Sequence, residues 1–383
     1  MMSAGERGPR ILFATIAAGG GHVAGAHAMA EAVEHHYPGR FELRISDYMK
    51  NLGTVRLDRF HKDSWRRALR YPILARAGQR VIDAFPRLTI AAERRILRDF
   101  ARAAASDLRE DPPLLIVSNH GLITTGLAEA KHRYSLEVPV LTFATEPFNI
   151  SAYWGEPRAD RIIVASEDGR RRLLHFGVPE DRMTIIGRPV RQAFLNAPAK
   201  LEAREHLGLG DRFTCVVSFG GEGVGRDPRG LIWALLDSGV ILQVVAITGR
   251  NKVLRGELRR LRPETNCLRV EGFVENLAEY LAASDVFVGK AGPSSVYEAL
   301  AVGRPALASG YAGLNELGVV RFIENEGLGR YVRTNAAVRG EVLRYARDPT
   351  LLEEVARRCR QLNLASSTER FAHHIVRYAL TGA

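Results

Sequence analysis

The chain has 383 residues, 46% of them hydrophobic and 25% charged, a composition typical of a soluble globular protein that is long enough for two domains. No run of about 18 uninterrupted apolar residues occurs, which excludes a transmembrane helix. The net charge of +11 favours an anionic partner: nucleic acid, an acidic membrane or a phosphorylated substrate.

The three cysteines, Cys215, Cys267 and Cys359, are widely spaced, odd in number and without a CxxC pair. This pattern argues against a disulfide framework and against a zinc site. It is typical of a protein that works in a reducing cytoplasm.

The first apolar run covers residues 11–18 and follows Arg7 and Arg10, an arrangement similar to a signal peptide. The run is short, however, and the glycines 19–21 and His22 follow it directly. A helical pattern then covers residues 24–35. We therefore interpret the segment as a strand, a glycine loop and a helix, and expect no signal peptide.

Short apolar runs separated by helical stretches continue along both halves of the chain. In the first half we expect strands at residues 11–16, 41–46, 114–118, 138–143, 162–165 and 183–186. In the second half we expect them at residues 215–219, 242–247, 268–270, 286–288 and 305–308. Such alternation is typical of parallel sheets covered on both faces.

The predicted fold class is therefore α/β, with two facing Rossmann-like lobes and a cleft between them. We expect an N-terminal lobe at 1–195 that binds acceptor and membrane, a C-terminal nucleotide-binding lobe at 196–365, and a helix at 366–383 that packs back across the lobes.

One region, residues 55–105, breaks the alternation. It is helical in pattern, and its many arginines alternate with large apolar residues such as Phe60, Trp65 and Leu74. Basic helices with such apolar faces suit the interface of an anionic bilayer. The alternative is a pair of surface helices that bury their apolar side in the lobe and solvate their arginines.

A glycine loop in the first lobe precedes a histidine. Gly20 and Gly21 allow close approach of a ligand, and a helix start favours anions or polar oxygens. The spacing is not the GxGxxG of dinucleotide binders. His22 would stand at the C-terminal edge of the sheet, where a general base belongs. The alternative is a helix-capping or structural histidine.

Two segments of the second lobe have the pattern of a phosphate site. Residues 220–225 form a second glycine-rich turn after a strand, and residues 286–300 read as strand, tight turn and helix. Backbone N–H groups near Ser294 and Ser295 can hold a diphosphate, and Glu298 one turn later suits a ribose diol. The alternative is an N-capped helix with a solvent-facing glutamate.

These segments resemble the donor half of monogalactosyldiacylglycerol synthases, which share features with processive diacylglycerol glucosyltransferases and the N-acetylglucosaminyltransferase of lipid II synthesis. The resemblance covers residues 11–331. In the second lobe it rests on residues 220–225, 248–252, 270–274, 290–299, 303–305 and 315–316. In the first lobe it rests on residues 19–22, 118–120, 145–154 and 187–191.

The resemblance implies a GT-B type enzyme that transfers a sugar with inversion and needs neither metal nor cofactor, the UDP-sugar being a co-substrate. His22 and Glu146 would be catalytic. The acceptor side would include Gly20, Gly21, His120 and Trp154, and the donor sugar would meet Asn315 and Glu316. Uracil would contact Phe273 and Val274, Glu298 would bind the ribose, and the remaining nucleotide contacts would come from Arg191, Gly220, Gly221, Glu222, Gly223, Arg250, Lys290, Gly292, Pro293, Ser294 and Ser295.

Three positions depart from the family pattern. Glu146 stands where the family usually has Asp, and Asn315 stands in place of a glutamine that reads the sugar. The stretch 147–153 also lacks the histidine that the family often has there. The identity of the hexose therefore stays open.

We predict transfer of galactose or glucose from a UDP-sugar to the hydroxyl of diacylglycerol, by a peripheral protein at the cytoplasmic face of an anionic membrane. One alternative is transfer of N-acetylglucosamine to a polyprenyl-linked acceptor. A second is a catalytically weak UDP-sugar sensor. We expect no nucleic-acid partner, because no helix-turn-helix, zinc-finger or RNP-like pattern occurs.

Overall fold

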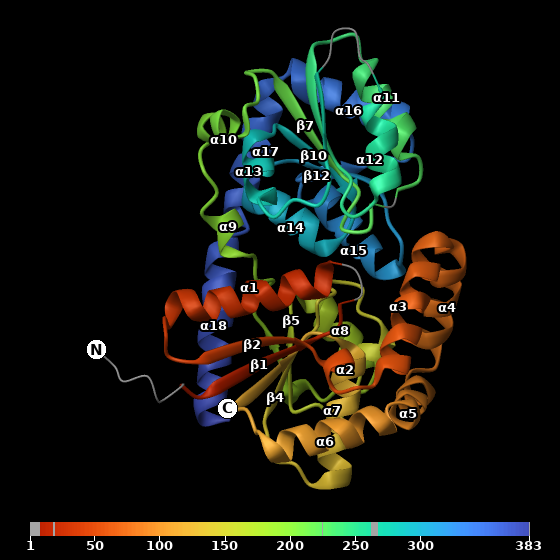
Figure 1. Cartoon of the computed structure of the whole chain (residues 1–383), viewed down its shortest axis with the longest axis vertical. Helices are drawn as coiled ribbons and strands as arrows, with labels where there is room; N and C mark the ends of the chain where they lie inside the picture. Colours follow the sequence, from red (N-terminus) through yellow and green to blue (C-terminus); the bar gives the residue numbers. More distant parts are fainter. Residues whose placement is uncertain (1–7, 18–19, 224, 262–266, 383) are drawn as a thin grey trace. The chain divides into compact units, whose positions relative to one another are not determined.

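The computed structural model describes residues 8–17, 20–223, 225–261 and 267–382 (Figure 1). The chain forms two compact units. The first lobe holds residues 1–191, 312–315 and 364–383, and the second lobe holds residues 192–311 and 316–363. The chain thus enters the second lobe after Arg191 and returns to the first lobe at Leu364.

The first lobe is built on a six-stranded parallel sheet of order β2-β1-β3-β4-β5-β6. Its strands are β1 (Arg10–Thr15), β2 (Glu42–Asp47), β3 (Leu115–Ser118), β4 (Val140–Phe143), β5 (Arg161–Val164) and β6 (Met183–Ile185). Its covering helices include α1 (Gly21–His36), α7 (Gly121–Tyr134), α8 (Glu167–His175) and α18 (Leu364–Thr381).

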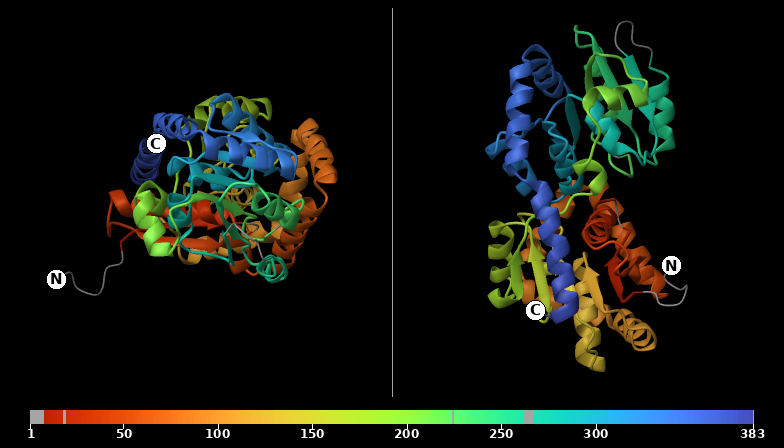
Figure 2. Two further views of the ribbon diagram at one scale, coloured as in Figure 1. Left: turned by 90° about the horizontal axis from the view of Figure 1, so that it is seen from above. Right: turned by 90° about the vertical axis from the view of Figure 1, so that its left-hand side faces the viewer.

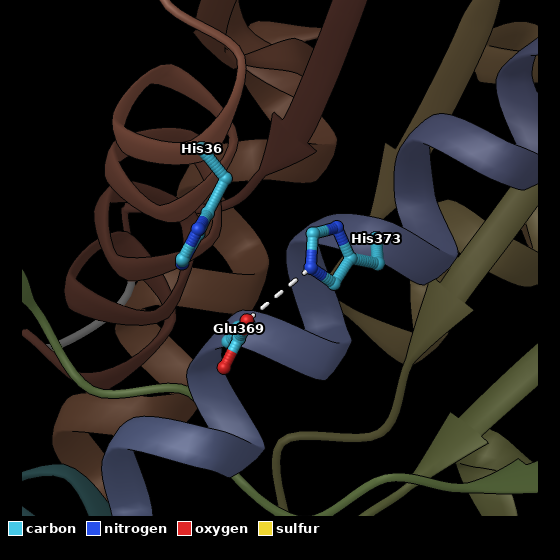
Figure 3. A group of neighbouring side chains, drawn as sticks. All are labelled: His36, Glu369 and His373. Atoms are coloured by element: carbon cyan, nitrogen blue, oxygen red, sulfur yellow. Dashed lines mark ion pairs between the residues drawn. The ribbon is translucent and has the colours of Figure 1, made fainter.

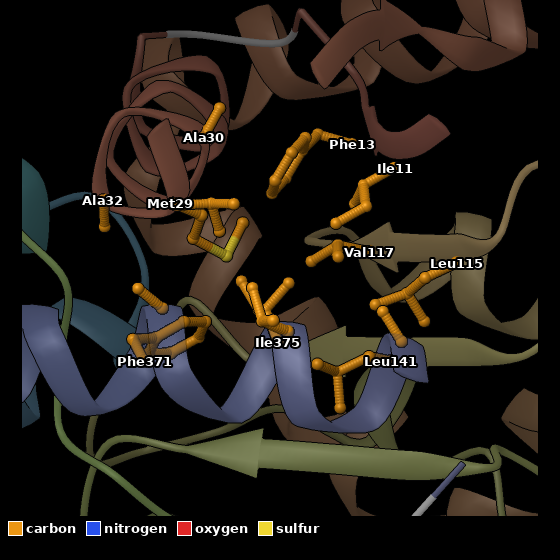
Figure 4. Packing of buried hydrophobic residues seen from close by; sticks show 14 of the residues in the cluster. Ile11, Phe13, Met29, Ala30, Ala32, Leu115, Val117, Leu141, Phe371 and Ile375 are labelled. Carbon is orange, nitrogen blue, oxygen red and sulfur yellow. The ribbon is translucent and has the colours of Figure 1, made fainter. Parts of the chain in front are cut away.

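The core of this lobe follows from the alternation of side chains along a strand. Ile11 and Phe13 of β1 are fully buried on one face, where Met29 of α1 and Phe371 of α18 meet them (Figure 4). Leu12, on the opposite face of β1, belongs to a second cluster with helices α6 (Arg98–Glu110) and α7. Both faces of the sheet are therefore covered, as expected for parallel strands.

The C-terminal helix α18 completes the first lobe. It runs along the face of the sheet (Figure 2) and lies against α1. Besides Phe371 it buries Ile375 completely. Full burial of each such side chain stabilises the folded state by roughly 1.5–3 kcal/mol, so α18 is an integral part of this lobe's core.

The second lobe repeats the plan with a parallel sheet of order β12-β11-β10-β7-β8-β9. Its strands are β7 (Phe213–Ser218), β8 (Leu242–Ile247), β9 (Cys267–Glu271), β10 (Val286–Lys290), β11 (Ala306–Gly310) and β12 (Gly329–Tyr331). Its helices include α9 (Gln192–Leu195), α10 (Lys200–Leu207), α11 (Pro228–Leu236), α12 (Lys252–Arg259), α13 (Leu277–Ala283), α14 (Pro293–Ala301), α15 (Leu314–Asn325), α16 (Asn335–Arg347) and α17 (Pro349–Gln361).

The expected α/β class and the two Rossmann-like lobes are confirmed. Each strand predicted from the sequence is present, with ends shifted by a few residues. The prediction missed β12, because a strand of three residues that begins with glycine and contains an exposed arginine has no apolar signal.

The arginine-rich region forms four consecutive helices: α3 (Val55–Arg70), α4 (Pro72–Ala84), α5 (Pro86–Ile96) and α6 (Arg98–Glu110). Prolines stand at the first position of α4 and of α5, where the missing N–H costs nothing, and they prevent the preceding helix from continuing. None of the helices that the structure describes is long and apolar enough to pass through a bilayer.

Candidate functional site

In each lobe there is one point at which successive strands are added to opposite sides of the sheet. In the first lobe this point lies between β1 and β3, because β2 pairs on the other side of β1. Ligands of open α/β sheets bind outside the carboxyl ends of strands at such a point. His22 follows β1, and Asn119 and His120 follow β3, so the sheet brings these residues together.

His22 is fixed by the loop after β3. Its Nδ1 lies 2.9 Å from the carbonyl oxygen of Asn119 and 3.3 Å from Oγ1 of Thr145. A carbonyl oxygen can only accept, so Nδ1 carries the proton and Nε2 carries a lone pair. Burial lowers the pKa of His22 to about 4, with smaller contributions from His61 and Arg188. The imidazole is therefore neutral at pH 7, and its Nε2 offers a lone pair.

Three histidine rings cluster at this edge. The ring of His120 lies 4.7 Å from that of His22 and 4.8 Å from that of His61, which comes from α3. The Nδ1 of His120 accepts from the N–H of Leu122, so this histidine caps α7. Burial and the neighbouring imidazoles lower the pKa of His120 well below its ordinary value. The capping interpretation, weighed for His22, thus applies to His120.

Glu146 is buried and engaged by its own loop. Its two carboxylate oxygens accept from the hydroxyl of Tyr153 at 2.7 Å and from the N–H of Ser151 at 3.0 Å. Burial raises the pKa of Glu146 to about 7, against the opposing effect of those hydrogen bonds. The geometry gives this carboxyl a positioning role for the segment 147–153, whereas its predicted catalytic role stays a prediction.

Trp154 is fully buried, in the short 3₁₀ helix Ala152–Trp154. Its ring centroid lies 6.4 Å from that of His22 and 6.3 Å from that of His120. The tryptophan therefore lies beside the histidine cluster. Gly20 and Gly21, by contrast, are exposed at the start of α1, and Gly20 supplies no capping side chain.

Three further residues at this edge were not predicted individually as site residues: Asn119, Thr145 and Arg188. Arg188 is buried, donates to the carbonyl oxygen of Thr145 and lies 5.9 Å from the ring of Phe143. His61 was missed for another reason, since it is one polar residue within the arginine-rich helices and only the tertiary fold brings it to His120.

In the second lobe the switch point lies between β7 and β10. The loop after β7 holds Gly220 and Gly223 at φ of 70° and 62°, a region that favours glycine. A Cβ on Gly223 would collide with the carbonyl oxygen of Thr248. The N–H of Arg250 donates to the carbonyl oxygen of Gly221 at 2.9 Å, which joins this loop to the one after β8.

The loops after β8 and β9 meet through a cation–π contact. The guanidinium carbon of Arg250 lies 4.8 Å from the ring centroid of Phe273, which is 57% exposed. The same arginine lies 3.8 Å from a carboxylate oxygen of Glu222. Residues predicted from separate loops therefore form one surface. Val274 follows Phe273 in the loop after β9, at the same edge of the sheet.

The turn after β10 leads into α14, which begins at Pro293 with Gly292 as the N-cap. Gly292 has no side chain to cap the helix, so the first turn presents backbone N–H groups that suit an anion. Ser294 and Ser295 lie in that turn, and Glu298 is buried one turn later. The predicted alternative of a solvent-facing glutamate is thereby excluded.

Lys290 and Glu316, two further predicted site residues, lie beside this turn. The ammonium group of Lys290 forms an ion pair with the buried carboxylate of Glu316. Arg191 is the last residue of the first lobe, and Asn315 lies in the segment 312–315 that belongs to it. The roles assigned to Arg191, Asn315 and Glu316 stay predictions.

Comparison with known proteins shows similarity to glycosyltransferases. Residues 230–309, within the second lobe, match the model of the glycosyltransferase family 28 C-terminal domain. The chain is 25% identical over 344 residues to monogalactosyldiacylglycerol synthase 1 of Arabidopsis thaliana, covering 86% of this chain and 63% of that protein. It is 24% identical over 270 residues to the processive diacylglycerol β-glucosyltransferase of Staphylococcus carnosus, covering 70% and 68%.

Among solved structures, the glycotransferase of kitacinnamycin is similar with a TM-score of 0.62 at 16% identity, covering 97% of this chain and 99% of that one. This likeness confirms the GT-B class of fold. The sequence similarities confirm the resemblance predicted from the motifs. The chain spans about three fifths of the length of the Arabidopsis relative.

Proposed function

We propose that this chain, with its glycosyltransferase family 28 C-terminal domain, transfers a hexose from a UDP-sugar to the hydroxyl of diacylglycerol at an anionic membrane surface. The proposal that the acceptor is a lipid rests on one observation. The histidine cluster of the first lobe lies directly against the amphipathic helices α3–α5. His61 of α3 contacts His120, and Asp83 of α4 accepts from the hydroxyl of Ser151 at 3.0 Å.

The outer side of α3–α5 has the chemistry of a membrane-binding surface. Ten of the seventeen exposed large apolar side chains among the described residues lie within 55–96. The same segment carries eleven arginines and lysines against four acidic residues. Apolar side chains that enter the headgroup region, combined with basic residues that attract anionic lipids, support peripheral binding.

The helices are held on the lobe by partly buried ion pairs. Asp83 also pairs with Arg172 of α8 at 2.8 Å, and Arg94 of α5 binds the fully buried Glu156 through two hydrogen bonds. Both anchors adjoin the Ser151–Trp154 segment, since Asp83 accepts from the hydroxyl of Ser151 and Glu156 comes two residues after Trp154. A lipid taken up along α3–α5 would therefore be delivered to a rigidly held acceptor site.

The chemistry that we propose starts with the acceptor hydroxyl bound at the loops after β1 and β3. Its proton moves to Nε2 of His22 while its oxygen attacks the anomeric carbon of the donor sugar. The bond from that carbon to the UDP oxygen breaks, UDP leaves with the electron pair, and the configuration inverts. Residues of the second lobe would stabilise the diphosphate charge by the uncapped first turn of α14 and by the loop at Gly220–Gly223.

The experiment is a donor panel. Purified protein is incubated with anionic vesicles that contain diacylglycerol, with UDP-galactose, UDP-glucose or UDP-N-acetylglucosamine, and glycolipid is measured by mass spectrometry. We expect a hexosyl diacylglycerol from UDP-galactose or UDP-glucose. Product only with a polyprenyl-linked acceptor, or UDP-sugar binding with no product from any acceptor, would contradict the proposal.

A further inference from the structure

A second group of histidines lies away from the sheet edge described above, where α1 meets α18. His36 comes from the last turn of α1, and Glu369 and His373 are four residues apart on one face of α18 (Figure 3). One ligand-type atom of each residue lies within 4.8 Å of the other two. All three belong to the first lobe.

The ring of His373 is held in one orientation. Its Nδ1 lies 2.7 Å from the hydroxyl of Tyr37, and its Nε2 lies 3.5 Å from a carboxylate oxygen of Glu369. The ring of His36 faces it, with 5.4 Å between centroids. Histidines that bind a metal through one nitrogen commonly use the other for such an outer hydrogen bond.

We propose that His36, Glu369 and His373 bind one zinc ion, with water in the fourth position. Two imidazole nitrogens and one carboxylate oxygen are a donor set that Zn²⁺ prefers. In a tetrahedral site the ligand atoms stand about 3.4 Å apart, which the Glu369–His373 pair already matches. His36 closes the remaining gap by side-chain rotation, since these side chains lie at the surface.

The ion would join the first helix of the chain to the last. Glu369 and His373 are about half exposed, whereas Phe371 between them is buried in the core beneath. Zinc on the surface would therefore fasten α18 over the apolar contacts that dock it on α1. The site is separate from the proposed transfer, which uses no metal.

The test titrates Zn²⁺ into the full-length, untagged, chelator-treated protein by calorimetry. We expect one ion per chain and a higher melting temperature with zinc. His373→Gln should weaken binding by at least about tenfold, and Tyr37→Phe by about tenfold through the lost outer hydrogen bond. Hydrogen exchange of α18 backbone amides should slow when zinc is added to the wild type.

The matched control is His27→Gln, an exposed histidine on the same helix α1, which should bind zinc as the wild type does. Circular dichroism of each metal-free variant checks that it is folded. Zinc binding by His373→Gln equal to that of the wild type, loss of binding in His27→Gln, or no binding by the folded wild type would each overturn the proposal.

Discussion

At the scale of single residues, the proposal depends on the state of His22. The carbonyl oxygen of Asn119 fixes the proton on Nδ1, and burial keeps the imidazole neutral. The sequence indicated His22 because it follows a glycine loop after a strand. It gave no indication of the Asn119 contact, because that contact joins residues 97 positions apart.

Replacement of this base tests its role. We expect His22→Ala to lower kcat by about 10²-fold or more, because a positioned general base contributes that much. UDP affinity, measured by calorimetry, should stay unchanged, since the loops that we propose to bind the diphosphate lie in the second lobe. His27→Ala, on the exposed side of the same helix, should keep full activity. Unchanged turnover of His22→Ala would make His22 a structural residue.

The low pKa of His22 predicts how kcat/KM depends on pH. A base with a pKa lowered to about 4 stays neutral as the pH falls through 6.5 and becomes protonated only near 4. We therefore expect kcat/KM to remain level down to about pH 5. Activity is measured in buffers from pH 4 to 8, with circular dichroism at each pH to separate unfolding. An acid limb centred near pH 6.5 would contradict the assigned environment.

At the scale of elements, alternation of apolar runs predicted the strands well, because buried parallel strands must be apolar. For the arginine-rich region, the sequence did not predict which apolar side chains are buried. The alternative of surface helices packed on the lobe is confirmed in part, since α5 and α6 bury Ile90 and Phe100, while Ile73, Leu74 and Phe85 stay exposed. The membrane interpretation stays a prediction. The sequence pattern alone does not tell which apolar residues another element covers.

Replacing an exposed apolar side chain of α4 tests directly whether this helix binds the membrane. Leu74 and Leu201 are equally exposed, at 70%, but Leu201 lies in the second lobe. We expect Leu74→Glu to weaken sedimentation with anionic vesicles several-fold, because a carboxylate enters the headgroup region poorly. Leu201→Glu should sediment as the wild type does. Equal behaviour of the two variants would remove α4 from the membrane surface.

The glycine loop of the second lobe offers another element-scale test. We expect Gly223→Ala to weaken UDP binding by about tenfold or more, because its methyl group would collide with the Thr248 carbonyl and displace the loop. Gly239→Ala is the control, since Gly239 has a similar positive φ of 75° with open space around it. If both variants bind UDP equally well, the loop does not hold the nucleotide.

At the scale of the whole molecule, the two lobes divide the proposed reaction. The first lobe holds the proposed base and the amphipathic helices, and the second holds the glycine loop and α14. The sequence predicted two lobes because its strand and glycine-loop pattern starts again at about residue 215. It did not predict the histidine cluster or the buried state of Trp154, because both depend on contacts between distant segments.

The proposed function requires that a lipid acceptor bind the first lobe beside α3–α5. The most direct measurement is photocrosslinking with a photoreactive diacylglycerol in anionic vesicles, followed by peptide mapping by mass spectrometry. We expect labels on peptides of α3–α5 and of the segments that carry His22 and His120, and unlabelled diacylglycerol should reduce them. Labelling confined to the second lobe, or labelling that unlabelled diacylglycerol does not reduce, would contradict it.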